Sequence, residues 1–177
     1  MIVKTKRKKK TKKMNKRSVT QLISDFKKYQ KKHIKNVKLE LNNGLKITHW
    51  IWYFFPSKIN NSKKLKYVLS QKTLYFSFYN KQEVYAFLNT PYLLKNYIIC
   101  LKILDETIKK TKKTQKYIMD SFNGSYDSEK VDKSKKYIKL SLIKMNKEIG
   151  LNKSQILLLK ILNKNWNKLL KKVLTKV

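Results

Sequence analysis

Apolar residues recur at helical spacing along most of the chain, and the first such stretch begins at Ser18. Ser18 and Gln21 have the spacing of a capping box, and Asn43-Gly44 offers a left-handed cap where the pattern stops. The positions between them that form one stripe with a period of 3.6 residues are Val19, Leu22, Ile23, Phe26, Tyr29, His33, Ile34 and Val37. The pattern therefore predicts a helix that opens at Ser18 and ends at Asn43-Gly44.

The middle of the chain alternates between helical and less regular patterns. Between Leu74 and Tyr79 aromatic residues alternate weakly, so a short strand or extended segment competes with a helix there. Asn80 and Glu83 form a second capping pair that starts a helix. Pro91 interrupts this helix, because proline cannot continue the backbone hydrogen-bond ladder. We expect a kink at Pro91, or a break between two helices.

Two further helices are predicted in the last third of the chain. Asp127 or Ser128 can cap the first of them, and Gly150 separates it from the second. The last helix has an apolar face made of Leu158, Ile161, Leu162, Asn165, Trp166, Leu169, Leu170 and Val173. Lysines lie mostly off this face. A basic amphipathic helix of this kind could lie on a membrane surface or in a partner's groove, and the segment concerned is residues 153–176. The alternative is that the stripe belongs to the core.

Length and composition favour one mainly α-helical domain with a tail. The chain has 177 residues, 41% of them hydrophobic, which is enough for one core and too apolar for a wholly disordered protein. The charge is extreme, with 44 Lys and Arg against 10 Asp and Glu and a formal net charge of +34. A small helical domain over residues 18–177 and a disordered basic tail over residues 1–17 are therefore expected.

The tail carries the most concentrated charge. Its basic residues, which no acidic residue offsets, are Lys4, Lys6, Arg7, Lys8, Lys9, Lys10, Lys12, Lys13, Lys16 and Arg17. Blocks of like charge stay extended and serve as nucleic-acid arms or nuclear-localisation signals. A tail that only increases solubility is the alternative, and an AT-rich genome would itself favour lysine over arginine. Such a genome would not deplete Asp and Glu, so the charge predicts nucleic acid or another polyanion as the partner.

The aromatic run from His49 to Pro56 is the best candidate for a ligand site. His49 is followed by Trp50 and Trp52, whose rings could stack on a base or another planar ligand. We expect His49 to be buried against these rings. The alternative is that the histidine bonds to backbone inside the core and that both tryptophans only pack. The sequence leaves open which of the two applies.

Other chemistry finds little support. Two histidines and the single cysteine, Cys100, cannot form a Cys/His zinc cluster, and three glycines give no phosphate-binding loop, so neither a metal nor a cofactor is expected. Cys100 lies in an apolar run and should be a buried, inert thiol. Asp127, Glu129 and Asp132 could gather a cation, but the lysines between them favour ion pairs.

The segment from Gly44 to Pro56 resembles the signature of a family of mostly helical proteins, the domain-of-unknown-function family 1810, sometimes labelled calpastatin. The family signature reads Gly-x-Lys-x-x-His-Trp-Met-Trp-aromatic-x-Phe-Pro, and residues 83–93 resemble a second box, Glu-Ala-x-x-Tyr-Leu-x-His-Pro-x-Leu. The resemblance covers roughly residues 22–143 and implies a helical fold. Ser57 replaces a glutamine and Thr90 a histidine of the family pattern. The family offers no activity to transfer.

These observations lead to one leading functional expectation and two alternatives. The leading one is a non-enzymatic basic protein that binds nucleic acid through its tail, as a packaging or nucleic-acid-associated component. The first alternative is a small-ligand-binding or enzymatic domain with a pocket around His49 and Trp50, and the second is membrane-surface contact by the last helix. No stretch reaches the roughly 20 apolar residues of a membrane span, and the lone cysteine suits a reducing compartment. An intracellular location is expected, the nucleus included.

Overall fold

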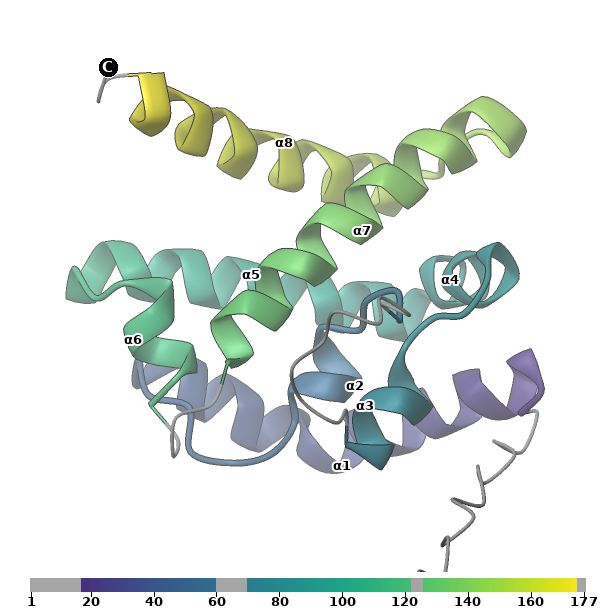
Figure 1. Cartoon of the computed structure of the whole chain (residues 1–177), viewed down its shortest axis with the longest axis horizontal. Coiled ribbons are helices and arrows are strands. Elements are labelled where there is room, and N and C mark those ends of the chain that lie inside the picture. The colour runs from purple at the N-terminus through teal and green to yellow at the C-terminus, as the bar shows by residue number, and fades with distance from the viewer. Residues whose placement is uncertain (1–16, 60–69, 122–125, 175–177) are drawn as a thin grey trace, which may run out of the picture.

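The computed structural model describes residues 17–59, 70–121 and 126–174, with side chains described as far as residue 164. Within these residues the regular structure is helical, apart from one isolated parallel bridge between Lys58 and Phe78. The helices are α1 (Val19–Asn42), α2 (Ile51–Phe54), α3 (Gln71–Phe76), α4 (Lys81–Leu88), α5 (Pro91–Thr111), α6 (Gln115–Met119), α7 (Asp127–Ile149) and α8 (Lys153–Leu174) (Figure 1). The prediction of a mainly α fold is confirmed.

The predicted limits of the first helix are confirmed. The Ser18 hydroxyl accepts a hydrogen bond of 3.0 Å from the backbone N–H of Gln21, which satisfies one of the free donors at the start of α1. After the helix, Gly44 has a φ of +65°, a conformation that costs glycine little. A Cβ atom at Gly44 would lie 3.3 Å from the Thr107 side chain. Gly44 therefore lets the chain turn close to α5.

The segment from Leu74 to Tyr79 combines both predicted possibilities. Ser70 caps α3 by accepting a hydrogen bond from the N–H of Thr73, so the first half of the segment is helical. The second half is extended. There the backbone N–H of Phe78 donates to the carbonyl of Ser57, and the carbonyl of Phe78 accepts from the N–H of Ile59. The break predicted at Pro91 is also confirmed, because α4 ends at Leu88 and Pro91 occupies the first turn of α5.

The predicted cap of α7 is wrong. Asp127 and Ser128 lie inside the helix, and the N-cap residue is Tyr126, which makes no side-chain capping bond. The backbone N–H of Ser128 instead donates to the carboxylate of Asp120, over 2.7 Å. Asp127 is buried and forms an ion pair with Lys46, so its carboxylate serves a contact between distant segments. Sequence spacing cannot reveal such a long-range partner.

The core lies where α1 packs on α5, with α4, α7 and the aromatic α2 segment completing it. Figure 1 shows α8 crossing α7 on the side of the molecule opposite α1. Leu158 and Leu162 of α8 belong to the core, which supports the core interpretation for the first part of that helix. Cys100 is fully buried, and its burial raises the pKa of the thiol to about 12. The prediction that Cys100 is buried is confirmed.

A search of the described helices finds none that is both long and apolar enough to span a membrane.

Candidate functional site

One buried carboxylate, that of Glu40, holds the loop between α1 and α2 in place. Glu40, near the end of α1, accepts hydrogen bonds from the backbone N–H groups of Ile47 and Thr48, at 2.9 and 3.1 Å. It also accepts from the indole N–H of Trp50 at 2.7 Å and from the Thr48 hydroxyl. Burial acts to raise the pKa of Glu40, but the hydrogen bonds outweigh it and hold the pKa below its ordinary value. Glu40 is therefore an ionised anchor for the loop.

A buried ion pair fixes the other end of this loop to α7. The ammonium of Lys46 lies 2.7 Å from Asp127 Oδ2, and the two side chains are only 1% and 6% exposed. Lys130 reaches the second oxygen of Asp127 at 2.9 Å, so the carboxylate faces two ammonium groups. The backbone N–H of Lys46 donates to the carbonyl of Ile118, which ties the loop to α6 as well. The loop is thus clamped to α1, α6 and α7.

Clamping of the loop separates the three predicted ligand residues. Trp50 is fully buried, with its N–H bonded to Glu40, so it belongs to the core and does not reach the surface. His49 is exposed, and the prediction that it is buried is wrong, because Trp50 rather than His49 occupies the position against Glu40. The imidazole of His49 stacks on Trp52, with ring centres 5.9 Å apart. The structure brings His49 and Trp52 together and excludes Trp50.

Trp52 is half-buried and lies between lysines of two helices. Its indole N–H donates to the Thr73 hydroxyl at 2.8 Å, which fixes the ring against α3. The ammonium groups of Lys72 and Lys130 each lie 5.5 Å from the centre of a Trp52 ring, within the range of cation–π attraction. We call His49, Trp52, Lys72 and Lys130 the Trp52 surface. Sequence reasoning missed both lysines, since they come from α3 and α7 and only the fold brings them to Trp52.

The cleft beside Trp52 is too small for an organic ligand. It has a volume of about 30 Å³ and is lined in part by Trp52, Ser57, Thr73 and Lys130. That volume suits about one water molecule, whereas ligand pockets usually exceed about 300 Å³. A ligand of Trp52 must therefore bind on an open surface and not in an enclosed pocket.

A second group of stacked rings continues from this surface along α1. Tyr53 lies 6.0 Å from Trp52, and Tyr29 and His33 stack on Tyr53 with ring centres 4.7 and 5.7 Å away. Burial, with the nearby positive charges of Lys32 and Lys72, lowers the pKa of His33 below its ordinary value. The aromatic residues thus border a strongly positive environment.

The solvent-facing side of α1 carries a row of lysines. The α1 lysine row consists of Lys27, Lys28, Lys31, Lys32 and Lys35, all exposed. Lys27 and Lys31, like Lys31 and Lys35, are four residues apart, so each pair shares one face of the helix. Such like-charge pairs destabilise a helix by about 0.2–0.5 kcal/mol each. The row therefore costs stability, which a purely structural role does not explain.

Arg17 belongs to the folded part and not to the tail. The sequence pattern assigns it to residues 1–17, but its side chain is only 9% exposed and pairs with Glu83 at 3.3 Å. The guanidinium donates to the carbonyl of Ser77 at 2.5 Å and lies about 5 Å from the ring centres of Tyr75 and Tyr79. Arg17 is therefore occupied by internal partners, and its assignment as a nucleic-acid contact is wrong.

The remaining basic residues assigned to the tail lie outside the described residues: Lys4, Lys6, Arg7, Lys8, Lys9, Lys10, Lys12, Lys13 and Lys16. Their proposed contacts with nucleic acid therefore stay predictions.

The acidic cluster at the start of α7 is divided among lysines. Asp127 pairs with Lys46, Glu129 with Lys133 at 2.8 Å, and Asp132 lies 3.7 Å from Lys135. These pairs agree with the ion-pair interpretation, although Asp127 is buried. No group of three or more His, Cys, Asp or Glu side chains suited to a metal is found in the described part of the chain.

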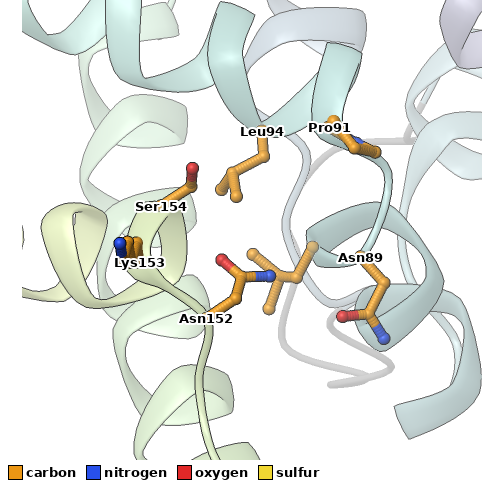
Figure 2. A pocket seen from close by; sticks show the side chains of 7 residues that line it. Asn89, Pro91, Leu94, Asn152, Lys153 and Ser154 are labelled. Atoms are coloured by element: carbon orange, nitrogen blue, oxygen red, sulfur yellow. The ribbon is translucent and has the colours of Figure 1, made fainter.

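A larger cavity lies at the junction of α4, α5 and α8. It has a volume of about 290 Å³ and is lined by Leu88, Asn89, Pro91, Leu94, Asn152, Lys153 and Ser154. Figure 2 shows the first residues of α8 facing Asn89, Pro91 and Leu94 across it. Lys153 is the one ionisable side chain in this lining, so the cavity offers no acid–base pair. Thr90, where the family pattern has histidine, lies between two lining residues, and its hydroxyl donates to the carbonyl of Ala86.

Comparison with known proteins gives a single result. Neither the curated proteins nor the solved structures include a match to this chain. The family model described as "Protein of unknown function (DUF1810)" matches residues 20–145, which include the clamped loop, Trp52 and both lysines beside it. Because the match spans more than half of the chain, the protein belongs to the DUF1810 family.

Proposed function

We propose that this protein is a non-enzymatic nucleic-acid-binding protein that holds the phosphate backbone with lysines of its first 16 residues and of the α1 lysine row. The observation that carries the proposal is the α1 lysine row, which is exposed and costs helix stability. Sequence-independent attraction to phosphates is the natural use of such a surface. The proposed setting is an intracellular compartment that contains nucleic acid, and a packaging or other structural role fits this chemistry.

The distribution of acidic groups supports the proposal. Nine of the 44 Lys and Arg precede Arg17, which leaves 35 against 10 Asp and Glu in the rest of the chain. The acidic side chains that accept a hydrogen bond or form an ion pair within the protein are Asp25, Glu40, Glu83, Asp105, Asp120, Asp127, Glu129, Asp132 and Glu148. Most of the negative charge is therefore engaged internally, and the surface that a partner meets is positive.

The dependence of affinity on salt tests this proposal. If six to eight basic residues of the tail neutralise phosphates, they contribute about −5 to −7 to the slope of log affinity against log salt on duplex DNA. The five lysines of the α1 lysine row can add up to about −4.5. Replacing the nine basic residues of 1–16 by Gln in the full-length chain should remove most of the first contribution. Replacing the five lysines of the row by Gln should remove the second.

A matched variant separates a located surface from net charge alone. Its five lysines, all exposed and outside α1, are Lys95, Lys102, Lys110, Lys147 and Lys160. Replacing them by Gln lowers the net charge by the same amount as replacing the α1 lysine row. The proposal expects a smaller loss of slope from this variant. Equal losses from both five-lysine variants would contradict the α1 assignment, and an unchanged slope after tail neutralisation would contradict the tail assignment.

A further inference from the structure

We propose that the Trp52 surface is a base-stacking site for single-stranded nucleic acid. This inference rests on the proposed function and adds the form of nucleic acid that the folded part selects. The observation behind it is the combination at one place of a partly exposed indole, a stacked imidazole and two lysines. Sites for single strands combine positive groups along the backbone with aromatic rings for the bases.

Two ammonium groups lie beside Trp52, where they can attract the phosphate of a nucleotide whose base stacks on the ring. Lys72 and Lys130 come from different helices, and each ammonium lies 5.5 Å from the centre of a Trp52 ring. A phosphate held by these ammonium groups would bring the attached sugar and base next to Trp52 and His49. Lysine makes point-charge contacts without reading sequence, and every base has a face that can stack. The site should therefore accept any base.

Polar contacts within the protein hold Trp52, Lys130 and the loop that carries His49 in position. Thr73 holds the indole N–H of Trp52 at 2.8 Å, and Asp127 holds the ammonium of Lys130 at 2.9 Å. Glu40 fixes the loop that carries His49 through the backbone of Ile47 and Thr48. Ordering side chains on binding costs affinity, and a pre-formed surface avoids much of that cost. This preorganisation is what a stacking site requires and what a merely charged patch does not need.

The chemistry favours a single strand over other anionic partners. In a duplex the base faces are stacked on one another, so a duplex can use the lysines but not the indole. An acidic peptide would likewise engage Lys72 and Lys130 and leave Trp52 without a planar partner. A membrane surface would require apolar residues to insert, whereas the Trp52 surface is fixed by polar contacts. The role of the ring therefore distinguishes a single strand from these partners.

The test compares Trp52→Ala with two controls in the full-length protein. Thr73→Val removes the hydrogen bond to the indole and keeps the ring, which measures the structural contribution of that bond. Tyr117→Ala removes another aromatic residue beside a lysine, since Tyr117 is 57% exposed and Lys113 lies 4.8 Å from its ring centre. The probes are an oligothymidylate of about 12 nucleotides, within the range of known single-strand sites, and an abasic strand of equal length.

We expect Trp52→Ala to weaken oligothymidylate binding between about 5-fold and about 150-fold, the loss typical of one base–aromatic stack. Binding of the abasic strand should change less than 2-fold by the same reasoning, because its phosphates still meet the lysines. Tyr117→Ala should leave both affinities unchanged, and Thr73→Val should have a smaller effect than Trp52→Ala. Thermal unfolding of each variant shows which of them keep the fold, and Trp52→Phe, which retains a stacking ring, should restore most of the binding.

Two outcomes for the variants, and one for the wild type, would overturn the inference. One is equal weakening of oligothymidylate and abasic strand by Trp52→Ala, and the other is failure of Trp52→Phe to bind better than Trp52→Ala. Neither outcome would contradict the proposed function, which rests on the tail and α1 lysines and is tested by the salt slope for duplex DNA. Conversely, a wild-type protein that binds the oligothymidylate no better than the abasic strand would remove the stacking site while leaving electrostatic binding in place.

Discussion

Replacing Glu40 by Gln should destabilise the protein by about 2 kcal/mol. The carboxylate accepts four hydrogen bonds, three of them from Ile47, Thr48 and Trp50 to one oxygen. A charge-assisted hydrogen bond contributes about 1 kcal/mol more to the free energy of unfolding than a neutral one, which gives about 3 kcal/mol for those three bonds. Burial of a neutral amide costs less than burial of a charge, which offsets part of this loss. The Thr48 hydroxyl can rotate to accept from the new amide.

Removal of the whole side chain should cost more. In Glu40→Ala the N–H groups of Ile47, Thr48 and Trp50 lose their acceptor, at about 1–3 kcal/mol for each group that stays buried. The total exceeds about 3 kcal/mol, a large part of the roughly 5–15 kcal/mol that stabilises a typical protein. The order of stability should therefore be wild type, Glu40→Gln, Glu40→Ala.

Urea unfolding monitored by tryptophan fluorescence measures these differences, provided that the slope of free energy against urea stays constant. Glu129→Gln is the matched control, because Glu129 is 54% exposed and forms a surface pair with Lys133. It should cost less than about 0.5 kcal/mol. If Glu40→Gln were no more destabilising than Glu129→Gln, Glu40 would not anchor the loop, and the argument that internal contacts hold the Trp52 surface in position would fail.

Three further predictions follow from the same contacts. Lys31→Glu should stabilise the protein by about 1 kcal/mol in urea unfolding, because it turns repulsion between lysines of α1 into attraction, and it should weaken DNA binding. Lys95→Glu, an equal charge change on α5, should neither stabilise the protein nor weaken binding. If Lys95→Glu had both effects and Lys31→Glu had neither, the role of the α1 lysine row would be contradicted. The free energy of unfolding should fall as the pH falls below 6.5, because the unfolded chain protonates His33 more readily than the folded one. It should fall again below pH 4.5, as Glu40 becomes protonated. Urea midpoints that rise on acidification would contradict both pKa directions. Binding of a strand should raise the pKa of His33, since phosphates offset the charges of Lys32 and Lys72; an NMR titration that finds it unchanged or lowered would place the strand elsewhere.

Local signals in the sequence were sufficient to predict the longer helices, but not the short helices α2 and α6. Ser18 and Asn80 cap helices through bonds to the third residue after them, and Gly44 and Pro91 mark turns that depend on their own backbone chemistry. These features involve neighbours in the chain, so spacing reveals them. The first long helix and the break at Pro91 were predicted on this basis.

The site could be predicted only in part, because its partners are distant in sequence. The aromatic run drew attention to His49 and Trp52, but the period of a short helix did not show that Trp50 would be buried and His49 exposed. The ion pair between Lys46 and Asp127 and the pairing of Arg17 with Glu83 join residues more than 60 positions apart. A charged residue with a buried partner cannot be told from a surface one by composition alone.

Lysine footprinting of the full-length protein, with and without single-stranded DNA, shows whether nucleic acid binds at the proposed lysines. Acetylation of each lysine, read by mass spectrometry, reports which ammonium groups the strand covers. Protection is expected for the lysines of residues 1–16, for the α1 lysine row and for Lys72 and Lys130. Lys147, near the end of α7, and Lys160, on α8, are exposed and belong to none of these groups, so they should not be protected. Uniform protection of all lysines, or protection centred on α8, would contradict the proposed binding surface.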